Sequence, residues 1–421
     1  CATKINFMKV AIIGSGIAGN TIAHLLHKDH DIKVFENESR VGGHSHTHTI
    51  QLTDNEEVSV DTGFIVFNKK TYPLFTALLD ELKVEYENSN MSFSVFSSVS
   101  GLEYNGTNLN TLFAQRKNIF NPRFIKMIFE ILSFNKKCLN LLNNDTDITL
   151  GEFLNSQNYS KFFSDHYILP MGSAIWSSDI ATMLNFPAKF FVTFLHNHGM
   201  LSIDDRPQWL TIKGGSKHYV EKLCQPFRKK IHLNAKIQSI KRLKNKVVII
   251  HQKSEEHFDY VFFACHSDQA LQLLSDPSND EKDILSSLPY VSNEVILHTD
   301  SNVMPKNKLA WAAWNYNIDK KPDDPITLTY NMNILQNLMT KESILVTLNP
   351  NKSIIEDRII KQLQYSHPKF SNQGIIAQKK HSLISGINNT GYAGAYWGNG
   401  FHEDGVKSAY NAIQHFKSSK K

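Results

Sequence analysis

The sequence predicts an α/β fold of two domains, in which the first domain is discontinuous and the second is an inserted α+β domain. Residues 8–13 form a β-branched run that leads into the segment GSGIAGN, an apolar helical segment and a second strand-like run at 31–36. Residues 72–210 change to long apolar and aromatic stretches with few glycine-led turns. The pattern of the first segment returns at Ile212, so the chain leaves the first domain and later re-enters it.

The expected elements follow from these patterns. After Ile212, a loop and helix precede paired strands over 231–252 and a buried strand that runs into a helix over 258–271. The runs VSNEVILHT, LAWAAWNY, ITLTYNMN and ILVTLNP predict an antiparallel sheet, and a helix ends the chain. We therefore place the first domain at 8–71, 211–285 and 381–417, and the inserted domain at 72–210 (mostly helical) and 286–380 (antiparallel sheet).

Composition narrows the class of protein. The 421 residues carry 45 Lys and Arg against 40 Asp and Glu, a net charge of +5 that is scattered in pairs. A nucleic-acid-binding protein would concentrate its basic residues more strongly, whereas binding to an anionic lipid surface is compatible with this charge.

The spacing of the four cysteines contains no C-x-x-C, so it predicts neither disulfides nor a zinc site, and it fits the reducing cytoplasm. No apolar run reaches the ~18 residues of a spanning helix, so we expect a cytoplasmic protein that is either soluble or in peripheral contact with the inner face of the membrane. Residues 1–7 precede Met8, which resembles a natural start, and are left out of the fold prediction.

The first glycine-rich segment has the spacing G-x-G-x-x-G in its required context. Gly14, Gly16 and Gly19 lie between a strand and a helix, and Glu36 ends the next strand. Gly14 permits the tight turn, Gly16 lets the backbone approach a pyrophosphate, and Gly19 lets the helix pack on the strand. Glu36 would accept the ribose hydroxyls, so the segment predicts a dinucleotide site. A loop that needs glycine only for its turns is the alternative.

A second glycine pair follows Glu36 closely. Arg40, Gly42 and Gly43 give E-x-x-x-R-x-G-G, which resembles the FAD-dependent amine oxidase, phytoene desaturase and protoporphyrinogen oxidase superfamily. The segments VDTGFIVFN, IKGGS, FFACHSDQAL and GNGFHEDG extend this resemblance over most of the chain. It implies FAD as the cofactor, held by a Rossmann-type domain like that of glutathione reductase and the amine oxidases.

The resemblance also implies the residues that contact FAD. These are Gly14, Ser15, Gly16, Ile17, Ala18, Gly19, Glu36, Asn37, Arg40, Gly42, Gly43, His44, Gly63, Phe64, Ile65, Ile237, Ala264, Phe401, His402, Asp404, Gly405 and Val406.

A narrower resemblance points to lipid chemistry. The segments TYPLF, GLEYNG, PMGSAIWS, FLHNHGML, RPQWLTIKGGS, LTYNMN and VTLNP look like the bacterial FAD-binding amine oxidoreductases found beside cyclopropane-fatty-acid synthase-like methyltransferases. Some members are methylated fatty-acyl phospholipid desaturases of furan fatty acid synthesis. The resemblance thus implies such a phospholipid as substrate and a functional link to the methyltransferase. Two positions depart from the pattern: His44 stands where an arginine is usual, and Asn399 where an aromatic is expected.

The segment GNGFHEDG leads into the terminal helix, and the start of that helix could contact the flavin. We expect Gly405 and Val406 to open the terminal helix, whose unpaired N–H groups can hydrogen-bond the flavin and stabilise negative charge on its reduced ring. In the alternative interpretation, Glu403 and Asp404 cap that helix.

Histidines form two further groups. His44, His46 and His48 alternate and would share a face in a strand, which allows a metal site, but a loop that wraps the cofactor accounts for them better. A covalent histidyl link to the flavin is a third interpretation. His196 and His198 lie in an aromatic segment, where a structural histidine competes with a catalytic one.

These observations give a leading hypothesis and two alternatives. In the leading one, hydride transfer to FAD and loss of a proton convert a methyl-branched monoene acyl chain into a conjugated diene. The candidates for the base are His402, Glu403 and His198. The alternatives are a flavin amine oxidase and a non-catalytic flavoprotein partner of the methyltransferase.

One amphipathic segment is compatible with a membrane. Residues 124–142 are strongly apolar and have basic residues at both ends. Such a helix could lie in a membrane interface, but a buried helix with solvated ends has the same pattern.

Overall fold

The computed structural model describes residues 7–53, 56–143, 147–202, 206–252, 254–319 and 324–420. Its first unit is built on a five-stranded parallel sheet in the order β10-β2-β1-β14-β20. The strands are β1 (Lys9–Ile13), β2 (Asp31–Phe35), β10 (Ile231–His232), β14 (Tyr260–Phe263) and β20 (Thr390–Tyr392). Four residues of β1 and all of β14 are buried, as expected for strands covered on both faces. The sheet joins strands from the beginning, middle and end of the chain, so the predicted discontinuity is present.

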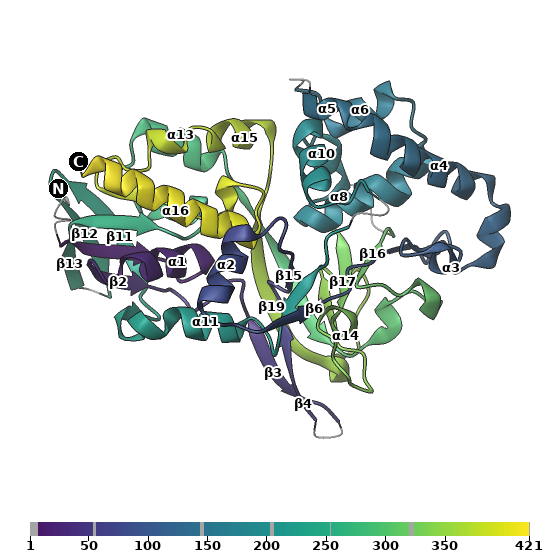
Figure 1. The fold of residues 1–421 in the computed structure, drawn as a ribbon, viewed down its shortest axis with the longest axis horizontal. Coiled ribbons are helices and arrows are strands. Elements are labelled where there is room, and N and C mark those ends of the chain that lie inside the picture. The colour runs from purple at the N-terminus through teal and green to yellow at the C-terminus, as the bar shows by residue number, and fades with distance from the viewer. Residues whose placement is uncertain are drawn as a thin grey trace.

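Helices cover one face of this sheet and a small antiparallel sheet lies on the other (Figure 1). Helix α1 (Ile17–Leu26) packs against the C-terminal helix α16 (His402–Ser419), with α11 (Lys217–Cys224) beside it. The antiparallel sheet consists of β11 (Ile237–Leu243), β12 (Lys246–His251) and β13 (Ser254–Phe258). Helices α12 (Ser267–Leu273), α13 (Asn279–Ser286) and α15 (Asn372–Gln378) complete this side.

Helix α2 (Pro73–Glu81) lies within the predicted inserted domain but packs with the first unit. Its residues Phe75, Leu78 and Leu79 share a buried core with α1 and α16. The chain therefore crosses to the second unit after α2, through the three-stranded sheet β5-β9-β6. These strands are β5 (Val66–Phe67), β6 (Tyr86–Asn88) and β9 (Leu210–Ile212).

The second unit contains a seven-stranded sheet in the order β19-β15-β18-β17-β16-β7-β8. Its strands are β7 (Phe93–Phe96), β8 (Glu103–Asn105), β15 (Tyr290–His298), β16 (Trp314–Asn317), β17 (Thr327–Asn331), β18 (Leu345–Leu348) and β19 (Ile359–Pro368). All pairings are antiparallel except that of β16 with β7. The strand predicted for LAWAAWNY is shorter than expected, because the Asn307 side chain accepts a hydrogen bond from the Leu309 N–H and starts a 3₁₀ turn over Lys308–Ala310.

A helical layer covers this sheet and forms the largest core with it (Figure 1). It comprises α3 (Leu109–Leu112), the 3₁₀ helix η1 (Arg116–Phe120), α4 (Pro122–Lys137), α5 (Asn140–Asn143), α6 (Leu150–Ser156), α7 (Lys161–Phe163), the π-helical turn η2 (Ser164–Ile168), α8 (Leu169–Trp176), α9 (Ile180–Leu184) and α10 (Ala188–Asn197). A hairpin of β3 (Thr47–Gln51) and β4 (Glu57–Asp61) and the short helix α14 (Met332–Leu335) lie at the opposite edge. Within the described residues, no helix combines the length and apolar composition needed to cross a bilayer.

Candidate active site

A cavity of about 940 Å³ extends from the glycine-rich turn after β1 into the second unit. Both units contribute to its lining, which includes Gly16 and Glu36 at one end and Tyr104 and Tyr167 at the other. Such a concave site between two units is where a cofactor and a substrate can meet.

The first glycine-rich turn has the backbone geometry that the spacing predicted. Gly14 has a φ of +102°, and a Cβ there would lie 2.7 Å from the Ala264 carbonyl oxygen. A Cβ on Gly19 would lie 2.0 Å from the Gly14 carbonyl oxygen, so Gly19 permits close packing and does not itself line the cavity. A Cβ on Gly16 would meet no protein atom within 4 Å, and Gly16 lines the cavity as the N-cap of α1. The bare backbone at Gly16 and the free N–H groups of the first turn of α1 suit a pyrophosphate.

Glu36 is buried at the end of β2 and lines the same end of the cavity. Its Oε2 accepts hydrogen bonds from the backbone N–H of Ser15 at 2.8 Å and from the Ser15 hydroxyl at 2.6 Å. Its Oε1 accepts from the backbone N–H of Glu38 at 2.9 Å. The carboxylate is thereby fixed beside the glycine-rich turn, in a position suited to ribose hydroxyls.

The second glycine pair is tied to the first turn. The Gly42 N–H donates to the Ser15 carbonyl oxygen at 2.9 Å, and the Arg40 guanidinium donates to the Gly43 carbonyl oxygen at 2.6 Å. Gly42 and Gly43 have φ values of +111° and +57°, in the left-handed region that glycine adopts without strain. Burial lowers the pKa of Arg40 from its ordinary value of 12.5. A guanidinium beside two bare backbone segments fits the diphosphate of FAD.

His44 is half-buried in the wall of the cavity. Its Nε2 has no hydrogen-bond partner among the described residues, and its ring lies 5.2 Å from that of Tyr365 and 5.5 Å from that of His367. Burial, and then the neighbouring His367, hold the pKa of His44 well below its ordinary value, so the ring is neutral. A buried ring nitrogen without a protein partner is the group that a bound cofactor would satisfy.

His46 and His48 contact each other, and His46 shares Tyr365 with His44. Their rings lie 4.0 Å apart, His46 Nδ1 is 2.9 Å from the Tyr365 hydroxyl, and His48 Nε2 is 3.2 Å from the Thr62 hydroxyl. Across the part of the chain that the structure describes, no three His, Cys, Asp or Glu side chains are grouped so as to hold a metal ion.

The C-terminal helix begins earlier than predicted. It starts at His402 with Phe401 as its N-cap, and the Asp404 carboxylate accepts a hydrogen bond from the Phe401 N–H at 3.0 Å. The expectation that Gly405 and Val406 open the helix is wrong, because the Gly405 N–H already donates to the Phe401 carbonyl oxygen at 3.1 Å. The unpaired N–H groups therefore belong to residues 402–404.

Gly405 has a packing role instead. A Cβ there would lie 2.7 Å from Cγ2 of Ile17, so glycine at this position lets α16 approach α1. Val406 is fully buried in the core that these two helices share.

His402 lies at the first position of α16 and lines the cavity. Its Nε2 is 2.7 Å from the Tyr219 hydroxyl and 3.1 Å from the Ser45 hydroxyl, and its ring stacks on Phe64 with centroids 3.7 Å apart. Burial lowers the pKa of His402 to about 3. The imidazole is therefore neutral and held by a buried network, with Nε2 already engaged.

Glu403 does not reach the cavity. Its carboxylate accepts hydrogen bonds from the backbone N–H groups of Leu74 at 3.0 Å and Phe75 at 2.9 Å, in the first turn of α2. Glu403 is not among the described residues that line the cavity. The expectation that it acts as a base is corrected accordingly: Glu403 caps α2, a helix other than its own.

His198 does line the cavity, at the C-cap of α10. Its Nδ1 lies 2.9 Å from the Phe194 carbonyl oxygen, and its ring stacks on Phe194 with centroids 3.9 Å apart. Burial lowers the pKa of His198 to about 4. His196, on the same helix, is exposed. Of the two histidines of this segment, the structure brings only His198 to the cavity.

Most of the predicted cofactor residues meet at the cavity. Those that line it are Gly14, Ser15, Gly16, Ile17, Ala18, Glu36, Asn37, Arg40, Gly42, Gly43, His44, Gly63, Phe64, Ile65, Ala264, Phe401 and His402. Gly19, Asp404, Gly405 and Val406 lie behind this surface, and Ile237 packs in β11 against the core under the small antiparallel sheet.

Other lining residues were not predicted. They include Cys265, His266, Gln269, Tyr290, Tyr365, His367, Gly394 and Ala395. Cys265, His266 and Gln269 lie within FFACHSDQAL, a segment that the resemblance had marked, and their place in that segment is the signal that could have identified them.

The end of the cavity in the second unit is mainly apolar and aromatic. Its lining includes Tyr72, Met91, Phe93, Tyr104, Tyr167, Met171, Ile175, Trp176, Phe194, Met200, Trp209, Trp314 and Tyr330. Among the described lining residues, the only carboxylates are Glu36 and Glu38, at the glycine-rich end. Arg206 is an exposed cation on the lining, with its Nε donating to the Ser202 carbonyl oxygen at 3.0 Å.

Solved structures with the same fold include enzymes that act on different substrates. The CLA-producing fatty acid isomerase from P. acnes is 16% identical and has a TM-score of 0.70, with 99% of this chain and 100% of that chain covered. Cyclohexylamine oxidase from Brevibacterium oxydans is 13% identical with a TM-score of 0.72, over 99% and 100% of the two chains. Putrescine oxidase bound to putrescine is 13% identical with a TM-score of 0.67, over 97% and 99%. At these identities the likeness is one of fold.

The family of the chain is established by a match between its sequence and a family model. The model for flavin containing amine oxidoreductases matches residues 21–374, which is most of the chain. The chain belongs to the flavin-containing amine oxidoreductase family and is an FAD-dependent oxidoreductase.

Proposed function

We propose that this oxidoreductase desaturates a methyl-branched, monounsaturated acyl chain of a phospholipid to a conjugated diene, a step of furan fatty acid synthesis. The observation that carries the proposal is the composition of the cavity beyond the cofactor end. Its described lining is mainly aromatic and apolar and contains no carboxylate there. An acyl chain has no polar group near its reacting carbons, so apolar burial, worth about 0.8 kcal/mol per CH₂, must hold it in place.

The same lining argues against an amine as the preferred substrate. A protonated amine that leaves water needs a carboxylate or a comparable partner, because an unpaired buried charge is strongly unfavourable. Arg206 has the opposite sign and suits an anionic headgroup. One solved structure with this fold is that of a fatty acid isomerase, and this supports the proposal because the same fold is used by an enzyme of fatty acids.

The cofactor end supplies the oxidant. FAD, when bound, accepts two electrons and one hydrogen as a hydride. The glycine-rich turn, Glu36 and Arg40 would hold its dinucleotide part, while Phe401 and His402 line the cavity where α16 begins. The substrate loses the hydride from an allylic carbon and a proton from an adjacent carbon, and a second double bond forms.

His198 is the best placed of the candidate bases. Because a carbonyl oxygen only accepts, His198 must donate its Nδ1–H to Phe194, and this leaves a lone pair on Nε2. The low pKa keeps the ring neutral and able to accept a proton at neutral pH. Such a base is weak, but loss of the hydride gives the acyl chain cationic character, and a proton next to a cationic carbon is readily removed.

Anaerobic reduction of the flavin tests the proposal. The FAD-loaded protein is mixed with methyl-branched monounsaturated phospholipid, the unbranched monoene, putrescine and cyclohexylamine, and bleaching of the flavin absorbance is followed with product analysis. We expect bleaching by the branched lipid, together with a conjugated diene. Bleaching by an amine and not by any lipid would establish an amine oxidase instead. Reduction by neither class, with tight binding to a lipid methyltransferase, would favour a non-catalytic partner.

A further inference from the structure

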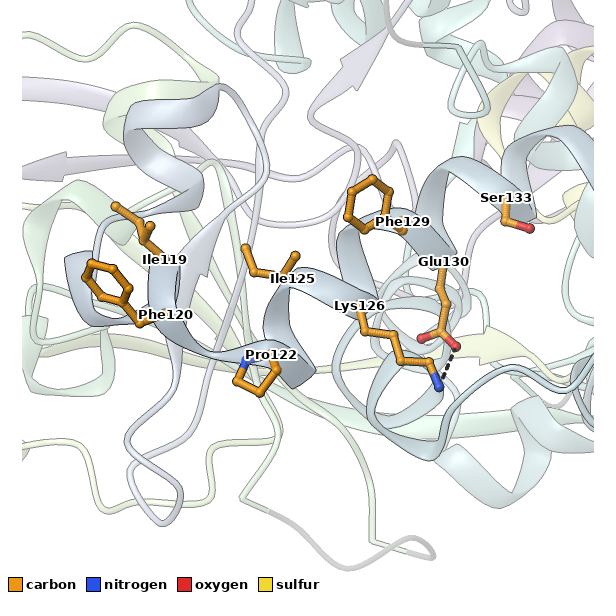
Figure 2. A pocket seen from close by; sticks show the side chains of 8 residues that line it. All are labelled: Ile119, Phe120, Pro122, Ile125, Lys126, Phe129, Glu130 and Ser133. Carbon is orange, nitrogen blue, oxygen red and sulfur yellow. Dashed lines mark ion pairs between the residues drawn. The ribbon is translucent and has the colours of Figure 1, made fainter.

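Helix α4 lies at the end of the molecule opposite both chain termini (Figure 1), and an exposed apolar face lies there. It is formed by η1 and α4, residues 116–137, and is called the η1–α4 surface here. The side chain of Phe120 is 86% exposed and that of Phe129 is 66% exposed. Figure 2 shows the groove of about 620 Å³ between them, which is lined by Ile119, Phe120, Pro122, Ile125, Lys126, Phe129, Glu130 and Ser133.

This face is distinct from the side of α4 that packs in the core. Phe124, Met127 and Phe134 are fully buried on the inner side of the helix. Phe129 and Leu132 therefore belong to a second apolar face, which continues onto Phe120 of η1. Contiguous exposed apolar surface of this kind marks a contact site on a folded protein.

The charge of this surface is concentrated and positive. Residues 116–137 contain six basic residues and one acidic residue, a net charge of +5 that equals the formal net charge of the whole chain. The acidic residue, Glu130, lies 3.8 Å from Lys126 and also accepts a hydrogen bond from the Ser160 N–H at 2.8 Å. Arg116, Lys117 and Arg123 lie near one end of the apolar face, and Lys136 and Lys137 near the other, all exposed.

We propose that the η1–α4 surface docks the protein on an anionic phospholipid bilayer. The aromatic and aliphatic side chains enter the boundary between headgroups and acyl chains, and the flanking cations contact lipid phosphates. An apolar face with cations at both ends matches a bilayer that has apolar chains beneath a layer of negative charge.

The position of this surface connects it to the cavity. The ring of Phe124, on the inner side of α4, lies 5.5 Å from that of Tyr104. Tyr104 and Tyr167 line the far end of the cavity. Helix α4 and the side chains on its inner side thus separate the docking surface from the region assigned to the acyl chain, a link that rests on the proposed function.

Flotation of the FAD-loaded protein with vesicles tests this inference. Vesicles of phosphatidylcholine alone are compared with vesicles that also contain phosphatidylglycerol, at low and high salt. We expect flotation with the anionic vesicles and its loss at high salt. The apolar variant Phe120→Ser with Phe129→Ser should bind at least about tenfold more weakly. The charge variant with Arg123, Lys136 and Lys137 each changed to Gln should bind about a hundredfold more weakly.

Matched controls lie elsewhere on the molecule. The exposed Lys241, Lys244 and Lys246 of the β11–β12 hairpin, changed together to Gln, remove the same charge. The exposed Met339, changed to Ser, removes apolar surface. Both controls should float like the unchanged protein, and flavin absorbance should show that every variant retains its fold.

Three results would overturn the inference. The protein could stay in the bottom fraction with anionic vesicles at low salt, or the control variants could reduce flotation as much as the η1–α4 variants. Sedimentation velocity could instead show a dimer that Phe120→Ser with Phe129→Ser abolishes, with no flotation, which would assign the surface to a second copy of the chain. Reduction of the flavin by detergent-dispersed lipid, measured alongside, separates a failed docking surface from a failed proposed function.

Discussion

The ring Nδ1 of His198 lies 2.9 Å from the carbonyl oxygen of Phe194, one turn earlier on the same helix. This hydrogen bond determines the tautomer, because the carbonyl oxygen can only accept, and it leaves the Nε2 lone pair of a cavity-lining histidine free to accept a proton. The imidazole also stacks on the Phe194 ring, with ring centroids 3.9 Å apart, and this contact fixes the plane of the imidazole. The backbone of α10 thus orients the side chain that we propose as the base.

Replacing this histidine should slow flavin reduction without loss of the cofactor. We expect His198→Gln to lower the rate of anaerobic flavin reduction by about a hundredfold to ten-thousandfold, the usual contribution of a positioned base. The flavin spectrum and the FAD content should not change. His196→Gln, at the exposed histidine of the same helix, is the control and should react at the normal rate. Equal rates in both variants would exclude His198 as the base.

Five buried or half-buried histidines should make the fold sensitive to acid. Burial lowers the pKa of His198, His367 and His48 to about 4 and that of His46 and His402 to about 3, from an ordinary value of 6.5. Below about pH 6.5 the unfolded chain therefore binds more protons than the folded one, and stability falls as the pH is lowered towards 4. Each histidine contributes on the order of 1.4 kcal/mol per pH unit in this window.

Thermal unfolding across this range measures the effect. The Tm of the FAD-loaded protein should fall continuously from neutral pH to about pH 4, and His198→Gln should show a shallower decline. A Tm that stays constant or rises on acidification would contradict the assignment of these rings as neutral in the folded protein.

Changing Gly16 or Gly19 to alanine should have different effects, the first on FAD binding and the second on the stability of the fold. Gly16→Ala places its methyl group in the open cavity, so the apoprotein should keep its stability while FAD binds at least about tenfold more weakly. Gly19→Ala places its methyl group against the Gly14 carbonyl oxygen and should destabilise the fold by about 1–3 kcal/mol. Fluorescence titration with FAD and denaturant unfolding of the apoprotein separate the two effects. The prediction fails if Gly16→Ala retains full FAD affinity.

Glu403 should matter for stability and not for chemistry. Glu403→Ala removes the acceptor for the Leu74 and Phe75 N–H groups, and the loss of this cap should lower the free energy of unfolding by about 0.5–2 kcal/mol. Glu403→Gln, which keeps one acceptor oxygen, should lose less. The rate of flavin reduction should be unchanged in both, and a large drop in that rate at full FAD occupancy would return Glu403 to the catalytic site.

The parts of the fold that depend on local spacing could be predicted from the sequence. The strand, glycine-rich turn and helix around Gly14 are encoded within about thirty residues, and the periodicity of a βαβ unit is strong over that length. The return of β14 to the sheet of β1, and of α16 to the helices packed on it, followed from motifs that have a known place in the family. The start of α16 was placed too late, at Gly405 and Val406, whereas the missing side chain of Gly405 serves the contact with Ile17.

Contacts between distant segments could not be predicted. Nothing near Glu403 in the sequence indicates that its carboxylate reaches the N–H groups of α2, more than 300 residues earlier. Likewise, Tyr365 and His367 reach the cavity through the pairing of β19 in the second sheet, which local patterns do not determine. Long-range register decides these positions, and a single sequence carries little of that information.

The order of strands β10-β2-β1-β14-β20 also bears on when the protein can acquire its cofactor. Strand β20 and helix α16 leave the ribosome after β1, β2 and β14, yet Phe401 and His402 line the same cavity as Gly14 and Glu36. A chain translated only as far as β14 therefore has no complete cofactor site. Flavin loading must follow the synthesis of α16, and a retained flavin marks a molecule in which the glycine-rich turn and α16 have come together.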